Sequence, residues 1–220
     1  MTRSSHRCAV IVSATLAVAA TQASAHPHVW VDAKAEIVFD GAGRISALRH
    51  IWQFDEGFTA FAVEGLDTDG DGQLSPAELD PLAKVNVDSL AEFGFFTFLG
   101  VGDEDEAFTP PQEYWLDFHG GRLTLFYTLP LAAPLTVAGE ATVQVYDPEF
   151  FVDFQFVPDN PVALVDAPAE CEAVYTPPGE IDVQTLVMLS QIPADQRELP
   201  PELRQATSVL ANAITITCLR

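Results

Sequence analysis

The chain has 220 residues, of which 48% are hydrophobic, and it carries a formal net charge of −22 at pH 7. This acidity disfavours nucleic acid and anionic membrane surfaces as partners, because both present phosphate groups that repel carboxylates. The longest uninterrupted apolar run is shorter than the ~20 residues that a helix needs to cross a bilayer, so we expect no direct membrane insertion.

The segment 1–25 has the features of a cleavable secretory signal peptide. Arg3 and Arg7 precede an apolar stretch over 9–20, and Ala23-Ser24-Ala25 matches the small-x-small pattern that a signal peptidase reads. We therefore expect a periplasmic protein whose mature chain, 26–220, forms a single domain.

Two cysteines remain after the expected cleavage, Cys171 and Cys218. An oxidising compartment favours a disulfide bond between them over two free thiols. Neither has a second cysteine at CxxC spacing or a cluster of histidines beside it. Metal or redox roles are therefore poor interpretations, and we predict a bond that ties the C-terminal segment to the rest of the domain.

The apolar pattern predicts an α+β fold that is mainly antiparallel β-sheet and sandwich-like. Alternating, β-branched or aromatic segments predict strands, and Gly120-Gly121 predicts a hairpin turn because glycine accepts positive φ. The predicted strands are 28–39, 44–54, a hairpin over 113–129, two strands over 141–157 around Asp147-Pro148, and 211–219.

Helical spacing predicts an EF-hand-like helix-loop-helix insertion at about 55–95 and a further helix over 181–192 near the C-terminus. Pro76 stands at a first-turn position that tolerates proline. The acidic, proline-containing segment 100–112 predicts an exposed loop.

The segment DTDGDGQLSPAE, residues 67–78, matches the calcium-loop pattern of an EF-hand at each constrained position. Gly72 permits the sharp turn at position 6, and Leu74 at position 8 is expected to point inward. The predicted calcium ligands are three carboxylates at positions 1, 3 and 5, a backbone carbonyl at 7, a hydroxyl at 9 and a bidentate carboxylate at 12: Asp67, Asp69, Asp71, Gln73, Ser75 and Glu78.

The alternative is an acidic turn that never fills with metal, but four carboxylates within twelve residues repel one another and a cation relieves that repulsion. Sensor EF-hands usually occur in pairs, and the second acidic run, DEDE at 103–106, lacks the loop spacing and the glycine. We therefore expect a structural clamp rather than a switch.

A second candidate metal site is His26 with His28. Cleavage after Ala25 would give His26 a free amine, and this amine with two imidazole rings suits nickel, cobalt, zinc or copper. Pro27 excludes the square-planar mode that needs a second-residue N–H. On a strand, His28 and Asp32 share a face. The alternative is a frayed terminus with no metal.

Further ligands for such a site would come from elsewhere in the chain. The candidates are His50, His119, Asp55 and Glu56. Each histidine is more simply interpreted as an ordinary surface or strand residue. The two acids are equally well interpreted as first-turn residues of the following helix.

Several blocks along the mature chain resemble one bacterial family. They are HPHVWVDA, WQFDEGFTAF, DTDGDGQLSPAEL, PLAKVNVDSL, FFTF, VYDPEFFVDF and NAITITC. Together they are similar to the periplasmic family catalogued as a domain of unknown function, number 1007, often labelled an uncharacterised ABC-type transport periplasmic component. The resemblance implies an exported protein whose relatives are commonly encoded beside metal transporters, with the HPH start as a suspected metal-binding feature.

The leading hypothesis is an exported metal-binding protein, with calcium in the loop and an accessory role in transition-metal transport beside an inner-membrane transporter. One alternative is an ABC-type receptor for a small organic ligand, using an aromatic face around Trp30, Trp52 and Tyr146. A purely structural calcium module is another. We expect no enzymatic activity, because no nucleophile, acid/base pair or complete ligand set is visible.

Overall fold

The structure is a computed structural model that describes residues 27–102, 104–193, 196 and 198–219. The predicted signal peptide over 1–25 and the candidate ligand His26 lie outside the described residues. No helix among the residues described is both long and apolar enough to span a membrane.

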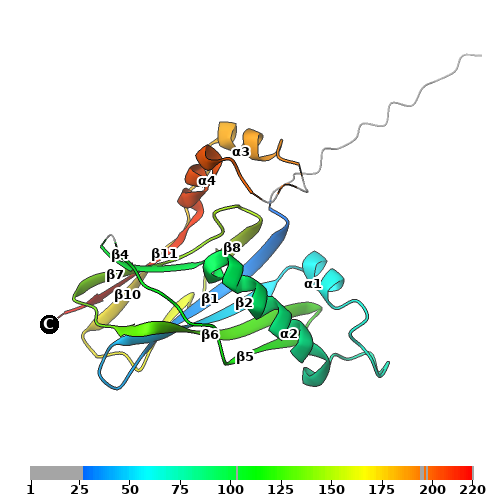
Figure 1. Ribbon diagram of the computed structural model, residues 1–220, viewed down its shortest axis with the longest axis horizontal. Coiled ribbons are helices and arrows are strands. Elements are labelled where there is room, and N and C mark those ends of the chain that lie inside the picture. The colour runs from blue at the N-terminus through cyan, green and yellow to red at the C-terminus, as the bar shows by residue number, and fades with distance from the viewer. Residues whose placement is uncertain (1–26, 103, 194–195, 197, 220) are drawn as a thin grey trace, which may run out of the picture.

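The larger sheet, sheet A, contains the predicted N-terminal hairpin, which is formed by the first two strands of the chain (Figure 1). Its order is β5-β6-β2-β1-β8, and β9 also pairs with β1. β8 and β9 run parallel to β1, whereas the other pairs are antiparallel. The strands are β1 (Val29–Phe39), β2 (Ile45–Phe54), β5 (Tyr114–His119), β6 (Arg122–Leu135), β8 (Val152–Phe156) and β9 (Val162–Val165).

The smaller sheet, sheet B, is antiparallel and has the order β10-β11-β7-β3-β4. Its strands come from the middle and the end of the chain, and the longest of them, β7 and β11, have 7 residues each. They are β3 (Thr97–Val101), β4 (Glu104–Asp105), β7 (Gly139–Val145), β10 (Cys171–Thr176) and β11 (Asn212–Cys218).

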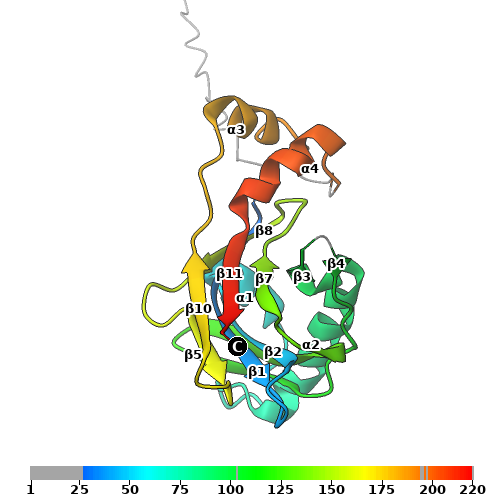
Figure 2. The same ribbon diagram turned by 90° about the vertical axis from the view of Figure 1, so that its left-hand side faces the viewer.

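Two groups of helices accompany the sheets. α1, α2 and the 3-10 helix η1 form the insertion between β2 and β3, while α3, α4 and η2 lie beyond one end of the sheets, as both views show (Figures 1 and 2). Their bounds are α1 (Glu56–Ala62), α2 (Pro76–Leu90), η1 (Ala91–Phe96), α3 (Val183–Leu189), α4 (Pro201–Thr207) and η2 (Ser208–Leu210).

The core lies on one face of sheet A. Alternate residues of β1 are buried from Val29 to Ile37, as period-2 burial requires, and they share one apolar cluster with Val143 and Ile214 of sheet B. Leu79 and Val87 of α2 join the same cluster, together with Ala83 between them. One face of sheet A is therefore covered by sheet B and by α2.

The predicted α+β class, the two hairpins and the helical insertion are confirmed. The strands predicted over 141–157 form on both sides of Asp147-Pro148, but β7 joins sheet B and β8 joins sheet A, so this turn carries the chain between sheets. β3, β4, β9, β10 and α4 were not predicted. Part of the expected exposed loop at 100–112 therefore pairs with sheet B.

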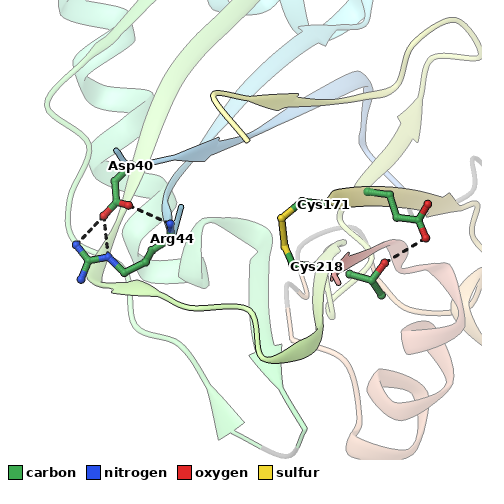
Figure 3. The surroundings of a disulfide bond; sticks show 6 residues. Asp40, Arg44, Cys171 and Cys218 are labelled. Carbon is green, nitrogen blue, oxygen red and sulfur yellow. Dashed lines mark hydrogen bonds and ion pairs between the residues drawn. A yellow bond between two sulfur atoms is a disulfide. The ribbon is translucent and has the colours of Figure 1, made fainter. Parts of the chain in front are cut away.

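The predicted disulfide bond joins Cys171 of β10 to Cys218 of β11, which stand directly opposite each other in the strand register (Figure 3). Figure 3 also shows Asp40 and Arg44, an ion pair of 2.6 Å in the turn between β1 and β2. The hydrogen bonds from the Arg44 side chain and backbone lower the pKa of the Asp40 carboxyl.

Removing the disulfide bond with Cys171→Ser/Cys218→Ser should lower the free energy of unfolding by about 2–4 kcal/mol, because the unfolded chain regains the freedom of a 47-residue separation. Urea unfolding at neutral pH measures the change, and reduced wild type should unfold at the same urea concentration as the variant. Equal stability of oxidised wild type and variant would contradict the prediction.

Candidate metal centre

The acidic loop between α1 and α2 is held in shape by its own first aspartate. Asp67 accepts hydrogen bonds from the backbone N–H of Gly70 at 2.8 Å and from that of Gly72 at 3.0 Å. Both glycines have positive φ, 75° and 79°, a region that disfavours residues with a Cβ. The two glycines thus allow the backbone to fold around the Asp67 carboxylate.

Two further aspartates point into the same turn. Asp69 accepts from the N–H of Asp71 at 3.1 Å, and Asp71 accepts from the N–H of Gln73 at 2.7 Å. One oxygen each of Asp67, Asp69 and Asp71 lies within 4.8 Å of the others, and all three residues are exposed. The loop therefore gathers three carboxylates, the ligand type that calcium prefers, at its solvent-facing side.

Glu78 is held by four donors near the start of α2. Its Oε1 accepts from the N–H and hydroxyl of Thr68 at 2.7 and 2.9 Å, and its Oε2 accepts from the N–H and hydroxyl of Ser75 at 2.9 and 2.8 Å. These bonds, the backbone bond from Ser75 first, lower the pKa of the Glu78 carboxyl to about 2. The Glu78 carboxylate thus links Thr68, at the second position of the loop, to Ser75, at the ninth.

The other predicted loop residues have structural roles that match their positions. Ser75 is the N-cap of α2 and forms a capping box with Glu78. Leu74 is partly buried and packs against the core cluster, as the inward direction of position 8 predicts. Among the described residues, the group of carboxylates within 4.8 Å of one another contains the three aspartates and leaves out Glu78.

His28 lies just before β1 and is partly buried. Its backbone N–H donates to the carbonyl of Phe151 at 2.8 Å, and its ring lies 4.7 Å from the Phe151 ring. Asp32, which was expected on the same face, forms an ion pair of 2.7 Å with Arg122. The Asp32 carboxylate is thus already neutralised by a guanidinium.

Among the residues that the structure describes, His28 and the additional ligand candidates do not form a group of three potential metal ligands. Asp55 is the N-cap of α1, accepting from the N–H of Phe58 at 2.9 Å and from that of Trp30 at 3.0 Å. Glu56 follows it in the first helical turn. His119 is exposed at the end of β5. One Asp55 oxygen therefore caps α1, and the other binds the backbone of β1.

His50 is buried at the contact between the two sheets, with only 1% of its surface exposed. Its Nε2 lies 3.3 Å from Oγ1 of Thr97 in sheet B, and its ring stacks on Tyr127 at 4.8 Å. Because the Thr97 hydroxyl donates to the carbonyl of Phe95 at 2.8 Å, Nε2 must be the donor toward Thr97. Burial lowers the pKa of His50 to about 3 and raises that of Tyr127.

The aromatic face suggested for an organic ligand does not form as predicted. Trp30 is 45% exposed on the outer side of β1, whereas Trp52 is buried in the core. The Tyr146 ring lies 5.1 Å from the Phe98 ring, just after the end of β7. The three side chains therefore lie in different places, and Trp52 instead lines a cavity that opens to solvent.

Two residues that anchor neighbouring segments through polar contacts, Asp147 and Arg122, were not identified from the sequence. Asp147 is buried and accepts N–H bonds from Glu149, Phe151 and Val152 at 2.9, 2.9 and 3.0 Å; burial raises the pKa of its carboxyl. An aspartate directly before proline in a turn was the available signal for this role.

Arg122 is the second anchor. Besides Asp32, its guanidinium donates to the carbonyls of Phe54 at 2.7 Å and Gln53 at 3.2 Å, so it joins the start of β6 to β2 and β1. Its sequence position, just after a glycine turn, gave no indication of these partners because they lie 68 to 90 residues away.

Comparison with known proteins gives two matches. The model of a family described as "Protein of unknown function (DUF1007)" matches residues 11–218. An "Uncharacterized 15.5 kDa protein in trpE 3'region" of Spirochaeta aurantia is 32% identical over 98 residues, which are 44% of this chain and 70% of that protein. Neither description names a ligand or an activity.

The burial of His50 predicts a specific loss of stability in acid. The unfolded chain takes up a proton at this residue below pH 6.5, whereas the folded chain does so only near pH 3. Its contribution is therefore intact above pH 6.5 and declines as pH falls toward 3. Between pH 7 and 4.5 this amounts to roughly 2–3 kcal/mol.

Urea unfolding of wild type and His50→Phe at both pH values tests this, because His50→Phe should lose less stability on acidification. His119→Gln serves as the control, since that histidine is exposed, and it should follow wild type. An identical acid loss in wild type and His50→Phe would refute the assignment.

Proposed function

The chain belongs to the DUF1007 family of proteins of unknown function, and from its acidic loop we propose that it is a calcium-binding protein. The observation that carries the proposal is the convergence of Asp67, Asp69 and Asp71, whose ligand oxygens lie within 4.8 Å of one another. Three exposed carboxylates so close together repel one another, and a divalent cation relieves that repulsion.

The ligand types fit calcium better than a transition metal. Oxygen ligands suit calcium and magnesium, whereas nickel, copper and zinc favour nitrogen or sulfur. The loop also offers the Gln73 carbonyl, the Ser75 hydroxyl and the Glu78 carboxylate, and this number of oxygens matches the six to eight that calcium takes. Magnesium demands a tighter octahedron, which a twelve-residue loop with a bidentate glutamate suits less well.

Glu78 would be the last ligand. Its oxygens accept four hydrogen bonds from Thr68 and Ser75, so calcium would replace part of this donor set as the positive partner of the carboxylate. The low pKa of Glu78, about 2, keeps it ionised at neutral pH. In this proposal no proton has to leave Glu78 before the ion binds.

We propose a structural role for the ion. The loop joins α1 to α2, and α2 is fixed to the core through Leu79, Ala83 and Val87. An ion held by the loop would therefore stabilise the first turn of a helix that already has a buried face. In this proposal, calcium fixes the helical insertion of a binding protein.

Isothermal titration of metal-stripped protein with calcium tests the proposal. Wild type should bind one ion, in about the 10⁻⁵ to 10⁻³ M range expected for a single loop outside a sensor pair. Glu78→Gln removes a bidentate ligand and a charge, and should weaken binding at least tenfold. Calcium should also raise the melting temperature of wild type.

Glu92→Gln is the matched control. Glu92 is an exposed glutamate beyond the other end of α2, so its replacement changes net charge equally without touching the loop. It should bind calcium like wild type. Absence of calcium uptake by wild type, or equal uptake by Glu78→Gln and Glu92→Gln, would show the assignment to be wrong.

We also propose that the protein is exported and that His26 with His28 holds a transition metal for a membrane transporter. Support comes from the signal-like segment 1–25 and the HPH start. Metal analysis of protein with His26 as its true first residue tests this. Equal nickel, cobalt, zinc and copper content in wild type and His26→Ala/His28→Ala would contradict the transition-metal role and leave the calcium proposal unaffected.

A further inference from the structure

A cavity of about 330 Å³ lies at one end of the core, away from the acidic loop. Its walls are the core face of β1, β2 and β6, the last turns of α2 with η1, and the turn that leads from β7 to β8. Sites that hold small organic molecules begin at roughly this size. The cavity opens to solvent, because its lining residues Ser89, Phe93 and Glu198 are exposed.

The walls of the cavity are mainly aromatic. Of the seventeen lining residues, seven are aromatic and five are aliphatic. The rings contact one another: Trp52 lies 4.7 Å from Phe154, Phe96 lies 5.4 Å from Phe154, and Phe93 stacks on Phe96 at 5.3 Å. The aromatic residues are Trp52, Phe54, Phe58, Phe93, Phe96, Phe151 and Phe154.

Two of the segments that form the cavity wall contain phenylalanines with positive φ. Phe95 and Phe96 have φ of 57° and 49°, and Phe150, beside the lining residue Phe151, has φ of 51°. This left-handed region is costly for a bulky side chain, and such strain concentrates at binding sites.

The charged side chains in the wall of the cavity indicate which charge a bound molecule would carry. Carboxylates of Asp147, Glu149 and Glu198 line the cavity, and lysine, arginine and histidine are missing from the lining among the residues that the structure describes. Glu149 is paired with Arg204 at 2.7 Å, and Asp147 accepts from three backbone N–H groups. An anionic ligand would meet repulsion here, while aromatic faces attract a cation.

We propose that this cavity binds an organic cation with an apolar body, of the quaternary-ammonium or alkylamine class. The apolar body would lie among the phenylalanines, and the ammonium would face aromatic rings and the Asp147 side of the wall. The inference goes beyond calcium binding and does not depend on it, because the 67–78 loop contributes no lining residue.

Titration with decyltrimethylammonium below its micelle concentration, followed by calorimetry, tests the proposal, with decanoate as the anionic counterpart of equal chain length. High salt suppresses general attraction to a protein of charge −22. Wild type should bind one decyltrimethylammonium per chain, at least tenfold more tightly than decanoate, with and without a calcium chelator.

Two pairs of variants separate the cavity from the surface. Ser89→Trp should fill the cavity from an exposed position on α2 and weaken binding at least tenfold, whereas Val85→Trp, on the same helix but outside the lining, should not. Phe93→Ala removes a half-exposed wall residue and should weaken binding about fivefold or more. Phe61→Ala, which is exposed and outside the lining, should leave it unchanged.

Melting temperatures of all four variants establish that they are folded. Absence of saturable binding by wild type would overturn the proposal. Equal affinities of Ser89→Trp and Val85→Trp would do so too, because the bound cation would then lie on the surface. Binding of decanoate as tight as that of decyltrimethylammonium would overturn the assigned charge of the ligand.

Discussion

The apolar face of sheet A is longer than either element that covers it, and the rest of the architecture depends on this mismatch. β6 has 14 residues, whereas β7, the central strand of sheet B, has 7. Sheet B covers one part of the face, and Leu79, Ala83 and Val87 of α2 cover another. The helical insertion is thus needed to complete the core.

The cavity lies where these two covers meet. η1 leads from α2 to β3 of sheet B, and the turn after Asp147 leads from sheet B to β8 of sheet A. Both connections line the cavity, and both contain phenylalanines with positive φ. A helix and a sheet present surfaces of different shape, so the seam between them fills less completely than either layer.

The acidic loop and the cavity share α2 as a structural support. Ser75 and Glu78 cap the helix at the loop end, while Ser89 and Leu90 line the cavity at the other. The two sites differ in how far apart in the sequence their residues lie. The loop concentrates exposed charge from neighbouring positions in the sequence, whereas the cavity concentrates aromatic surface from strands and helices far apart in the chain.

The local features were determined by the sequence itself. The hairpins, the helix-loop-helix and the aspartate cluster follow from spacing and turn residues, since each is formed by one continuous segment with its turn or loop inside it. Only the tertiary structure decided that β7 and β8 separate into different sheets, that His50 is buried against Thr97, that Arg122 neutralises Asp32, and that Trp52 lines a cavity. These contacts join residues 47 or more positions apart or depend on which sheet a strand enters, and periodicity carries no information about that choice.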